Sequence, residues 1–194
     1  MKTVRNKISI GITGTIGSGK STVTNCFKEK GYNIFDSDYI NNYLLYNDLE
    51  IIELLKLNFN ECFEQDLLIK SKLSDLVFSN EQKRSLLNSI MHPRITKELD
   101  KYLSNNDIRI CEVPLLFELN LQNKFDIIIL VVTDIEIIKQ RLINKGYNTN
   151  KINSIINIQK DYDSKIKGSD VLFYNNKSKE ILENNVNKWI KENL

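Results

Sequence analysis

The sequence has a single histidine and only three cysteines among its 194 residues. The cysteines, Cys26, Cys62 and Cys111, are widely separated, and no C-x-x-C pair occurs. This scarcity excludes a cysteine–histidine zinc site and a disulfide framework. We expect the three thiols to be small apolar side chains of the interior, because free cysteine is usually buried.

Long hydrophobic runs and a strong charge imbalance are also missing. No stretch approaches the roughly 20 apolar residues of a membrane-spanning helix, and the basic N-terminus lacks the apolar core and cleavage site of a signal peptide. The formal net charge of +2 is too small to indicate a nucleic-acid partner. We expect a globular, cytosolic protein with no membrane and no nucleic-acid partner, whose oligomeric state the sequence leaves open.

Strand and helix patterns alternate over most of the chain. Five short segments rich in apolar and β-branched residues predict strands: residues 8–13, 32–35, 108–113, 125–132 and 171–174. Helical spacing occupies 21–30, 134–145 and 178–194, with Asp134 expected as an N-cap. The continuous apolar run at 125–132 is typical of a strand buried on both faces of a parallel sheet. We therefore predict an α/β fold, a three-layer sandwich around a parallel five-stranded sheet.

A mostly helical segment, about residues 37–103, interrupts this alternation. Breaks are expected around residues 58–65 and at His92-Pro93. Proline is tolerated in the first turn of a helix, so Pro93 is predicted to start a new helix rather than to lie inside one. We expect this insertion to be a substrate-binding part of the same single domain.

The strongest motif follows the first predicted strand. Residues 14–21 match G-x-x-x-x-G-K-[S/T] in full: Gly14, Thr15, Ile16, Gly17, Ser18, Gly19, Lys20 and Ser21. Glycines let successive backbone N–H groups point at phosphate oxygens, and the helix that begins here adds its positive dipole end. Lys20 would bind the β- and γ-phosphates, and the Ser21 hydroxyl would ligate magnesium. A strand–loop–helix context argues against a chance glycine-rich turn, so we predict a P-loop NTPase fold that binds ATP and Mg²⁺.

Carboxylates stand where the second and third predicted strands end. Asp36 and Asp38 follow the second strand, and Glu112 lies in the third. The carboxyl ends of parallel strands converge on the crevice that holds the phosphates, so Asp36 is well placed to accept a proton from an attacking hydroxyl. Asp38 has an alternative role as the N-cap of the next helix. The sequence leaves open whether Asp38, Glu112 or Glu118 holds the water shell of the metal.

Two further features favour a kinase over a regulatory GTPase. The guanine-specificity element N-K-x-D is missing, because neither Asn144-Lys145 nor Asn176-Lys177 is followed by the aspartate. Small-molecule kinases also close a basic lid over the phosphates. Residues 141–168 supply such a stretch through Arg141, Lys145, Lys151, Lys160, Lys165 and Lys167. A solvated helical face is the alternative for the lysines, whereas the planar guanidinium of Arg141 suits a transferring phosphoryl group.

The whole pattern resembles the dephospho-coenzyme A kinase family. Residues 10–22, which end in Gly19-Lys20-Ser21-Thr22, resemble its L-T-G-G-I-G-S-G-K-S-T opening, and residues 36–38 resemble its D-A-D element. His92-Pro93-x-Ile95 resembles its H-P-x-I region, and residues 112–118 resemble E-V-P-L-L-F-E closely. The family's closing Q, R, A-D and N-N have counterparts in Gln159, Lys165, Ser169-Asp170 and Asn175-Asn176. Many kinases share the P-loop, but the other elements together are specific.

This resemblance implies transfer of the ATP γ-phosphate to the ribose 3′-hydroxyl of dephospho-coenzyme A, the last step of coenzyme A synthesis. It implies that Asp36 is the general base, that Lys20 and Arg141 bind the phosphates, and that residues 14–22, including Thr22, hold the nucleotide. The acceptor-binding residues that it implies are Asp36, Asp38, His92, Pro93, Ile95, Pro114, Leu115, Leu116, Phe117 and Glu118. For His92 a local hydrogen bond at a helix start is the alternative, and for residues 115–117 a place in the core or a pocket wall.

The sequence departs from the family at three positions. Thr15 stands where glycine is common, and Lys145 and Lys165 stand where arginine is common. Lysine cannot form the bidentate fork of arginine, so lid closure is expected to contribute less to turnover.

Two other functions remain to be weighed. A kinase for a nucleoside monophosphate would need an arginine clamp, and no arginine follows Pro114. A nucleotide-dependent switch or binding module is disfavoured by the missing guanine element and by the substrate-sized insertion.

Overall fold

The computed structural model describes residues 7–105, 107–149, 152–153, 156 and 162–194. The chain divides into two compact units. One, here the sheet unit, consists of Met1–Asp36 and Leu103–Leu194, and the other, here the helical unit, is Ser37–Tyr102. The boundaries of the helical unit lie within one residue of the insertion expected from the sequence.

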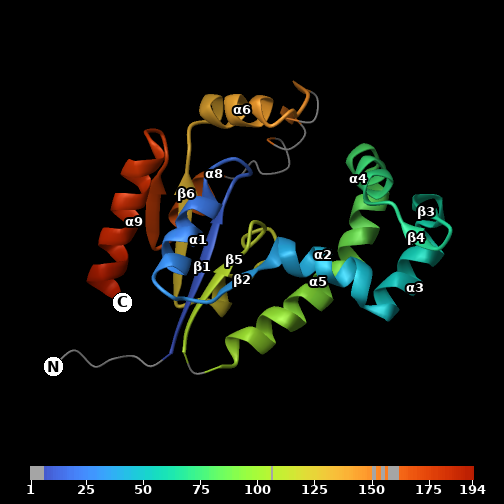
Figure 1. Cartoon of the computed structure of the whole chain (residues 1–194), viewed down its shortest axis with the longest axis horizontal. Coiled ribbons are helices and arrows are strands. Elements are labelled where there is room, and N and C mark those ends of the chain that lie inside the picture. The colour runs from blue at the N-terminus through green and yellow to red at the C-terminus, as the bar shows by residue number, and fades with distance from the viewer. Residues whose placement is uncertain (1–6, 106, 150–151, 154–155, 157–161) are drawn as a thin grey trace. The chain divides into compact units, whose positions relative to one another are not determined.

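The sheet unit is built on five parallel strands (Figure 1). Their order is β2-β5-β1-β6-β7, and every pairing is parallel. The strands are β1 (Ile8–Gly14), β2 (Ile34–Asp36), β5 (Ile108–Glu112), β6 (Ile127–Val132) and β7 (Val171–Tyr174). This confirms the predicted parallel five-stranded sheet. The strand that carries the glycine loop, β1, lies in the middle, between β5 and β6.

The described helices of the sheet unit include the three that the sequence predicted, at 21–30, 134–145 and 178–194, and one short helix that it did not predict, at 162–167. They are α1 (Lys20–Glu29), α6 (Ile135–Asn144), α8 (Tyr162–Lys167) and α9 (Lys179–Asn193), with a short 3₁₀ turn, η2 (Gln122–Lys124). Val23 and Phe27 of α1 join Val186 and Ile190 of α9 in one apolar cluster with strand residues such as Ile129. Because side chains alternate along a strand, these two helices cover one face of the sheet.

The helix ends show which cap signals act. Gly31 follows α1 with a φ of 87°, the left-handed conformation expected of a C-terminal glycine. The Ser178 side chain accepts a hydrogen bond from the N–H of Ile181 and so caps α9. Asp134 does occupy the N-cap position of α6, but its side chain makes no capping hydrogen bond.

All three cysteines are buried, as expected of free thiols. Burial raises the pKa of the Cys111 thiol, so this group stays protonated in the apolar interior. Within the part of the chain that the structure describes, no helix is long and apolar enough to cross a bilayer.

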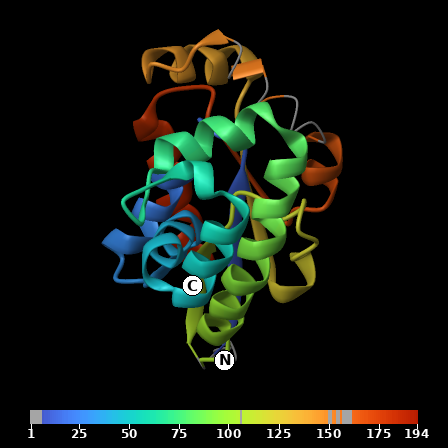
Figure 2. The same cartoon turned by 90° about the vertical axis from the view of Figure 1, so that its right-hand side faces the viewer.

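The helical unit has four α-helices (Figure 2). They are α2 (Ser37–Asn47), α3 (Leu49–Asn58), α4 (Lys70–Ser79) and α5 (Glu81–Leu103), which runs one residue beyond the unit. Between α3 and α4 the chain forms the 3₁₀ turn η1 (Asn60–Cys62) and a small hairpin of β3 (Phe63–Glu64) and β4 (Leu67–Leu68). This confirms the break expected around residues 58–65.

The expected second break, at Pro93, is wrong. Pro93 lies inside α5, which is continuous over 23 residues. Proline removes one hydrogen bond of the helix and is strongly unfavourable in its interior. Apolar side chains on both sides of it, Met91 and Ile95, nevertheless pack into the same cluster with Leu55. Burial of this face therefore holds the two halves of α5 in one helix, and the helix-start alternative for His92 fails with the predicted break.

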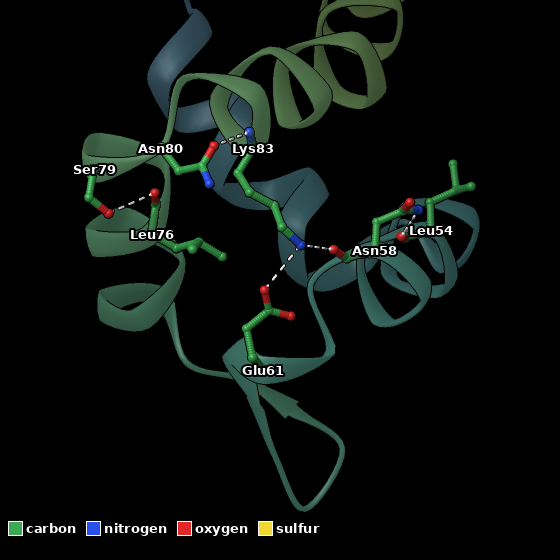
Figure 3. A network of polar contacts seen from close by, with 7 residues as sticks. All are labelled: Leu54, Asn58, Glu61, Leu76, Ser79, Asn80 and Lys83. Atoms are coloured by element: carbon green, nitrogen blue, oxygen red, sulfur yellow. Dashed lines mark hydrogen bonds and ion pairs between the residues drawn. The ribbon is translucent and has the colours of Figure 1, made fainter.

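Lys83 of α5 joins three segments of the helical unit (Figure 3). Its ammonium donates to the carbonyl oxygen of Asn58 at 2.7 Å and lies 3.1 Å from a carboxylate oxygen of Glu61. The same nitrogen is 5.0 Å from the ring centre of Phe59, within the range of a cation–π contact. The pKa of the Glu61 carboxyl is lowered, first by a backbone hydrogen bond and then by Lys83. Lys83 thus fastens the start of α5 to the chain that leaves α3.

Candidate active site

The glycine loop has the backbone that a phosphate cradle requires. Gly17 and Gly19 have φ values of 79° and 102°, in the left-handed region that side chains rarely adopt. A Cβ on Gly14 would lie 2.7 Å from the carbonyl oxygen of Val131 and 2.8 Å from Ser18 Oγ. The glycines therefore allow both the turn and the close approach of β6.

Side chains from distant segments hold the loop from behind. The carbonyl oxygen of Ser18 accepts hydrogen bonds from Asn175 Nδ2 at 2.7 Å and from Thr133 Oγ1 at 2.9 Å. In a trans peptide the next N–H points away from the carbonyl. Fixing the Ser18 carbonyl consequently aims the N–H of Gly19 to the opposite side.

Arg141 makes contacts to the same loop. Its guanidinium donates to the carbonyl oxygens of Gly17 at 3.1 Å and of Asn175 at 3.0 Å. Arg141 lies in the last turn of α6, so these bonds connect α6, the glycine loop and the chain after β7. The predicted phosphate ligand is therefore engaged with backbone oxygens next to the phosphate cradle.

Lys20 and Ser21 open α1, as the motif predicts. The Lys20 side chain is buried, and its Nζ donates to the carbonyl oxygens of Gly14 at 2.8 Å and Thr15 at 3.2 Å. These bonds hold the ammonium over the loop. Ser21 is exposed and Thr22 half-buried in the first turn, where backbone N–H groups and the helix dipole favour an anion.

Two carboxylates end neighbouring strands. Asp36, the last residue of β2, is in register with Glu112, the last residue of β5. Glu112 Oε2 accepts a hydrogen bond from Thr24 Oγ1 of α1 at 3.0 Å. Asp38 lies inside the first turn of α2, which begins at Ser37, so its alternative role as the N-cap is wrong.

The loop after β5, residues 114–120, is attached to the sheet and to α8. Thr13 Oγ1 donates to the carbonyl oxygen of Pro114 at 3.2 Å. Leu116 is fully buried, whereas Leu115 and Phe117 are half-buried. Glu118 forms an ion pair with Lys165 at 2.6 Å. Leu116 thus belongs to the core, which was the alternative for this segment.

The predicted site residues are divided between the two units. The sheet unit brings together the glycine loop, Arg141, the carboxylates Asp36 and Glu112, and the 114–120 loop. Asp38, His92, Pro93 and Ile95 belong to the helical unit. His92 is half-buried, and burial lowers the pKa of its imidazole.

The lysines of the stretch expected to form a lid differ in their exposure to solvent. Lys145 and Lys167 are exposed, and Lys165 is buried in its pair with Glu118. Lys151, Lys160 and Gln159 lie outside the described residues.

Three residues that contact the loop or its surroundings were missed as site residues. Asn175 and Thr133 hold the Ser18 carbonyl, and the Tyr162 hydroxyl accepts a hydrogen bond from the N–H of Thr133 at 3.0 Å. Asn175 and Thr133 directly follow β7 and β6, and their positions at strand ends were a usable signal. No pattern in the sequence marks Tyr162.

A cleft of about 380 Å³ lies beside these residues in the sheet unit. Its polar lining comes from Thr15, Thr133, Asp134 and Tyr162, and its apolar lining includes Ile138 and Ile166. The Thr15 hydroxyl is buried and has no hydrogen-bond partner within the described structure.

Comparison with known proteins connects this site to one family. A family model described as dephospho-CoA kinase matches residues 8–180. A dephospho-CoA kinase of Fusobacterium nucleatum is 34% identical over 185 residues, which are 93% of this chain and 95% of that protein. The crystal structure of TT1252 from Thermus thermophilus is 29% identical with a TM-score of 0.81, covering 97% of this chain and 98% of that one. A dephospho-CoA kinase from Campylobacter jejuni, 22% identical with a TM-score of 0.64 over 96% of this chain and 97% of its own, shares the fold. The chain belongs to the dephospho-CoA kinase family.

Proposed function

We propose that this protein transfers the γ-phosphoryl group of ATP to the ribose 3′-hydroxyl of dephospho-coenzyme A, giving coenzyme A and ADP, the final step of coenzyme A biosynthesis. The observation that carries the proposal is the family match over residues 8–180, which includes a fully formed phosphate loop and the 114–120 loop. The reaction is an in-line displacement in which positioning and charge neutralisation supply most of the rate.

The donor half of the reaction belongs to the glycine loop. Backbone N–H groups at the start of α1 would bind the β- and γ-phosphates, and Lys20 would exchange its bonds to the Gly14 and Thr15 carbonyls for phosphate oxygens. The Arg141 guanidinium is hydrogen-bonded to the carbonyl oxygen of Gly17 in the same loop. It would stabilise the loop in the ground state and charge on the transferring group in the transition state.

Asp36 is the proposed general base. It ends β2 at the carboxyl edge of the sheet, where an acceptor hydroxyl can approach the γ-phosphate. The neighbouring Glu112 accepts a hydrogen bond from Thr24 on α1, which suits Glu112 to fixing α1 and ordering water. Asp36 would take the proton of the 3′-hydroxyl as the oxygen attacks phosphorus.

The donor atoms of the site fit a magnesium ion carried by ATP. Ser21 offers an exposed hydroxyl beside the phosphate cradle, and Asp36 and Glu112 offer carboxylate oxygens for its water shell. Among the described residues no group of three or more His, Cys, Asp or Glu side chains could hold a metal ion, and magnesium in kinases is held largely by phosphates and water. When bound, the ion would neutralise charge on the β- and γ-phosphate oxygens.

The acceptor half is assigned to the helical unit and the 114–120 loop. Asp38, His92, Pro93 and Ile95 are the proposed contacts in the helical unit, and Pro114, Leu115, Phe117 and Glu118 those in the loop. Leu116 supports the loop from the core. Residues 141–168 remain the proposed lid, and a cytosolic location remains a prediction.

An acceptor panel tests the function. The purified protein is assayed for ADP release with ATP, Mg²⁺ and, in turn, dephospho-coenzyme A, adenosine and nucleoside monophosphates. We expect release that depends on dephospho-coenzyme A and a product phosphorylated at the 3′-oxygen. Preference for a monophosphate would favour the rival kinase, and acceptor-independent or absent release would favour a binding module.

A further inference from the structure

A buried lysine of α8 is paired with a glutamate of the 114–120 loop. The Lys165 side chain is only 4% exposed, and its Nζ lies 2.6 Å from Glu118 Oε1, whose side chain is 27% exposed. An ammonium buried without a partner is strongly unfavourable, and so is a carboxylate left beside it alone. Removing one member therefore disturbs the other. The position of Glu118 is tied to that of α8.

Other contacts attach the same loop to the same helix and to β1. A Cβ on Gly168, the residue after α8, would lie 2.7 Å from Phe117 Cε1. A Cβ on Gly11 of β1 would lie 2.7 Å from Leu116 Cδ1. Glycine at both positions lets the loop approach closely. The 114–120 loop is thus packed against the sheet through Leu116 and against the end of α8 through Phe117.

The opposite end of α8 is attached beside the glycine loop. Tyr162, its first residue, accepts a hydrogen bond from the N–H of Thr133 and donates to the carbonyl oxygen of Thr133 at 3.3 Å. Thr133 in turn donates to the carbonyl oxygen of Ser18. One short helix therefore connects the loop that would bind ATP with the loop that would bind the acceptor. Lys165 is on the acceptor side of this connection.

We propose that Lys165 is a positioning residue for the acceptor: through Glu118 it holds the 114–120 loop in the geometry that receives dephospho-coenzyme A. The inference rests on the proposed function, because it assigns a residue that sets the acceptor site of that reaction. In this arrangement the Lys165 ammonium is paired with the Glu118 carboxylate. Lys165 acts on the acceptor through the loop, whereas a lid cation would act on the ATP phosphates directly.

A kinetic experiment separates these two roles. The variants are Lys165→Met, Lys165→Arg, Glu118→Gln and the double variant Lys165→Met/Glu118→Gln. Lys179→Met is the matched control, because it breaks an exposed ion pair with Glu183 on α9 of the same unit. Steady-state rates are measured with each substrate varied in turn, and thermal unfolding is recorded for every variant.

We expect Lys165→Met and Glu118→Gln each to raise the KM for dephospho-coenzyme A by about tenfold, while the KM for ATP stays near the wild-type value. Lys165→Arg, which keeps the charge, should recover most of the loss. The double variant should be no worse than the poorer single variant, because residues of one pair are not additive. Lys179→Met should behave as the wild type.

Several results would overturn the positioning role. These are an equal rise in both KM values, additive effects in the double variant, or a Lys165→Met enzyme with unchanged kinetics. If Lys165→Met fails to fold, Glu118→Gln and Lys165→Arg decide the question by the same split between substrates. A wild-type protein without dephospho-coenzyme A activity would refute the proposed function, whereas an active wild type with unaffected variants refutes only the role of Lys165.

Discussion

The side chain of Asn175 occupies the space that any side chain at Gly19 would need. A Cβ on Gly19 would lie 2.2 Å from Asn175 Nδ2, which donates to the Ser18 carbonyl. The two residues are far apart in the sequence. The absence of a side chain at Gly19 nevertheless leaves the room in which the Asn175 amide supports the phosphate loop.

Gly19→Ala should therefore destroy nucleotide binding. The change forces Asn175 away and also places alanine at a φ of 102°. We expect ATP affinity, measured by calorimetry, to fall by about 100-fold or more, since the loop loses both its turn and its support. Gly31→Ala is the control, because Gly31 has a φ of 87° but no atom within 4 Å of an added Cβ. That variant should lose only about 1 kcal/mol of stability and keep its ATP affinity. Equal losses in the two variants would contradict the role of Asn175.

Asp36→Asn tests the general base. Asparagine keeps the size of the side chain but cannot take the proton, so kcat should fall by about 100-fold or more. The dissociation constant for ATP, measured without acceptor, should hardly change. Asp107→Asn makes the same chemical change at the other end of β5, where Asp107 pairs with Arg109, and should leave kcat intact. Near-normal turnover of Asp36→Asn would remove Asp36 from this role.

Arg141→Met tests whether this arginine supports the loop as well as the transition state. Because the guanidinium bonds to the Gly17 and Asn175 carbonyls, its loss should weaken ADP binding by about tenfold in addition to lowering kcat. ADP lacks the γ-phosphate, so a group that acts on the transferring phosphoryl alone would leave ADP affinity unchanged. Titration calorimetry with ADP distinguishes the two cases.

Lys83→Met should destabilise the helical unit. The variant keeps the apolar stem but loses the bond to the Asn58 carbonyl and the ion pair with Glu61. We expect the free energy of unfolding in urea to fall by about 1–3 kcal/mol. Lys56→Met removes the more exposed pair with Asp66 and should lower the stability less, because exposed ion pairs contribute little. A larger loss in Lys56→Met than in Lys83→Met would contradict the assignment.

The single histidine should give the stability a pH dependence. Burial lowers the pKa of His92 in the folded protein, so the unfolded chain binds its proton first as the pH falls. Stability contributed by the neutral imidazole is complete above the unfolded pKa of about 6.5 and is lost as the pH falls from there through the folded pKa. Urea unfolding between pH 7.5 and 5 measures this slope. In His92→Gln the slope over that window should become shallower, and an unchanged slope would assign it to other groups.

Local patterns accounted for much of this molecule. The apolar runs predicted all five strands of the parallel sheet but not the hairpin of β3 and β4. The helix expected from residue 21 begins one residue earlier, at Lys20, and it was predictable because strand, loop and helix are adjacent in the chain. The continuity of α5 through Pro93 could not be predicted, since contacts with other helices outweigh a local rule. The same holds for the support of the loop by Asn175 and for the pairing of Lys165 with Glu118. Both join segments that only the fold brings together.

The order of the strands gives the backbone unequal local stability at the two halves of the proposed reaction. The donor loop leaves β1, which is hydrogen-bonded along both sides by β5 and β6. Asp36 ends β2, a three-residue strand at the margin of the sheet with a single neighbour. Strands at the edge of a sheet open locally more readily than strands in its centre. The end of β2, which carries the proposed general base Asp36, is therefore expected to open locally while the glycine loop stays folded.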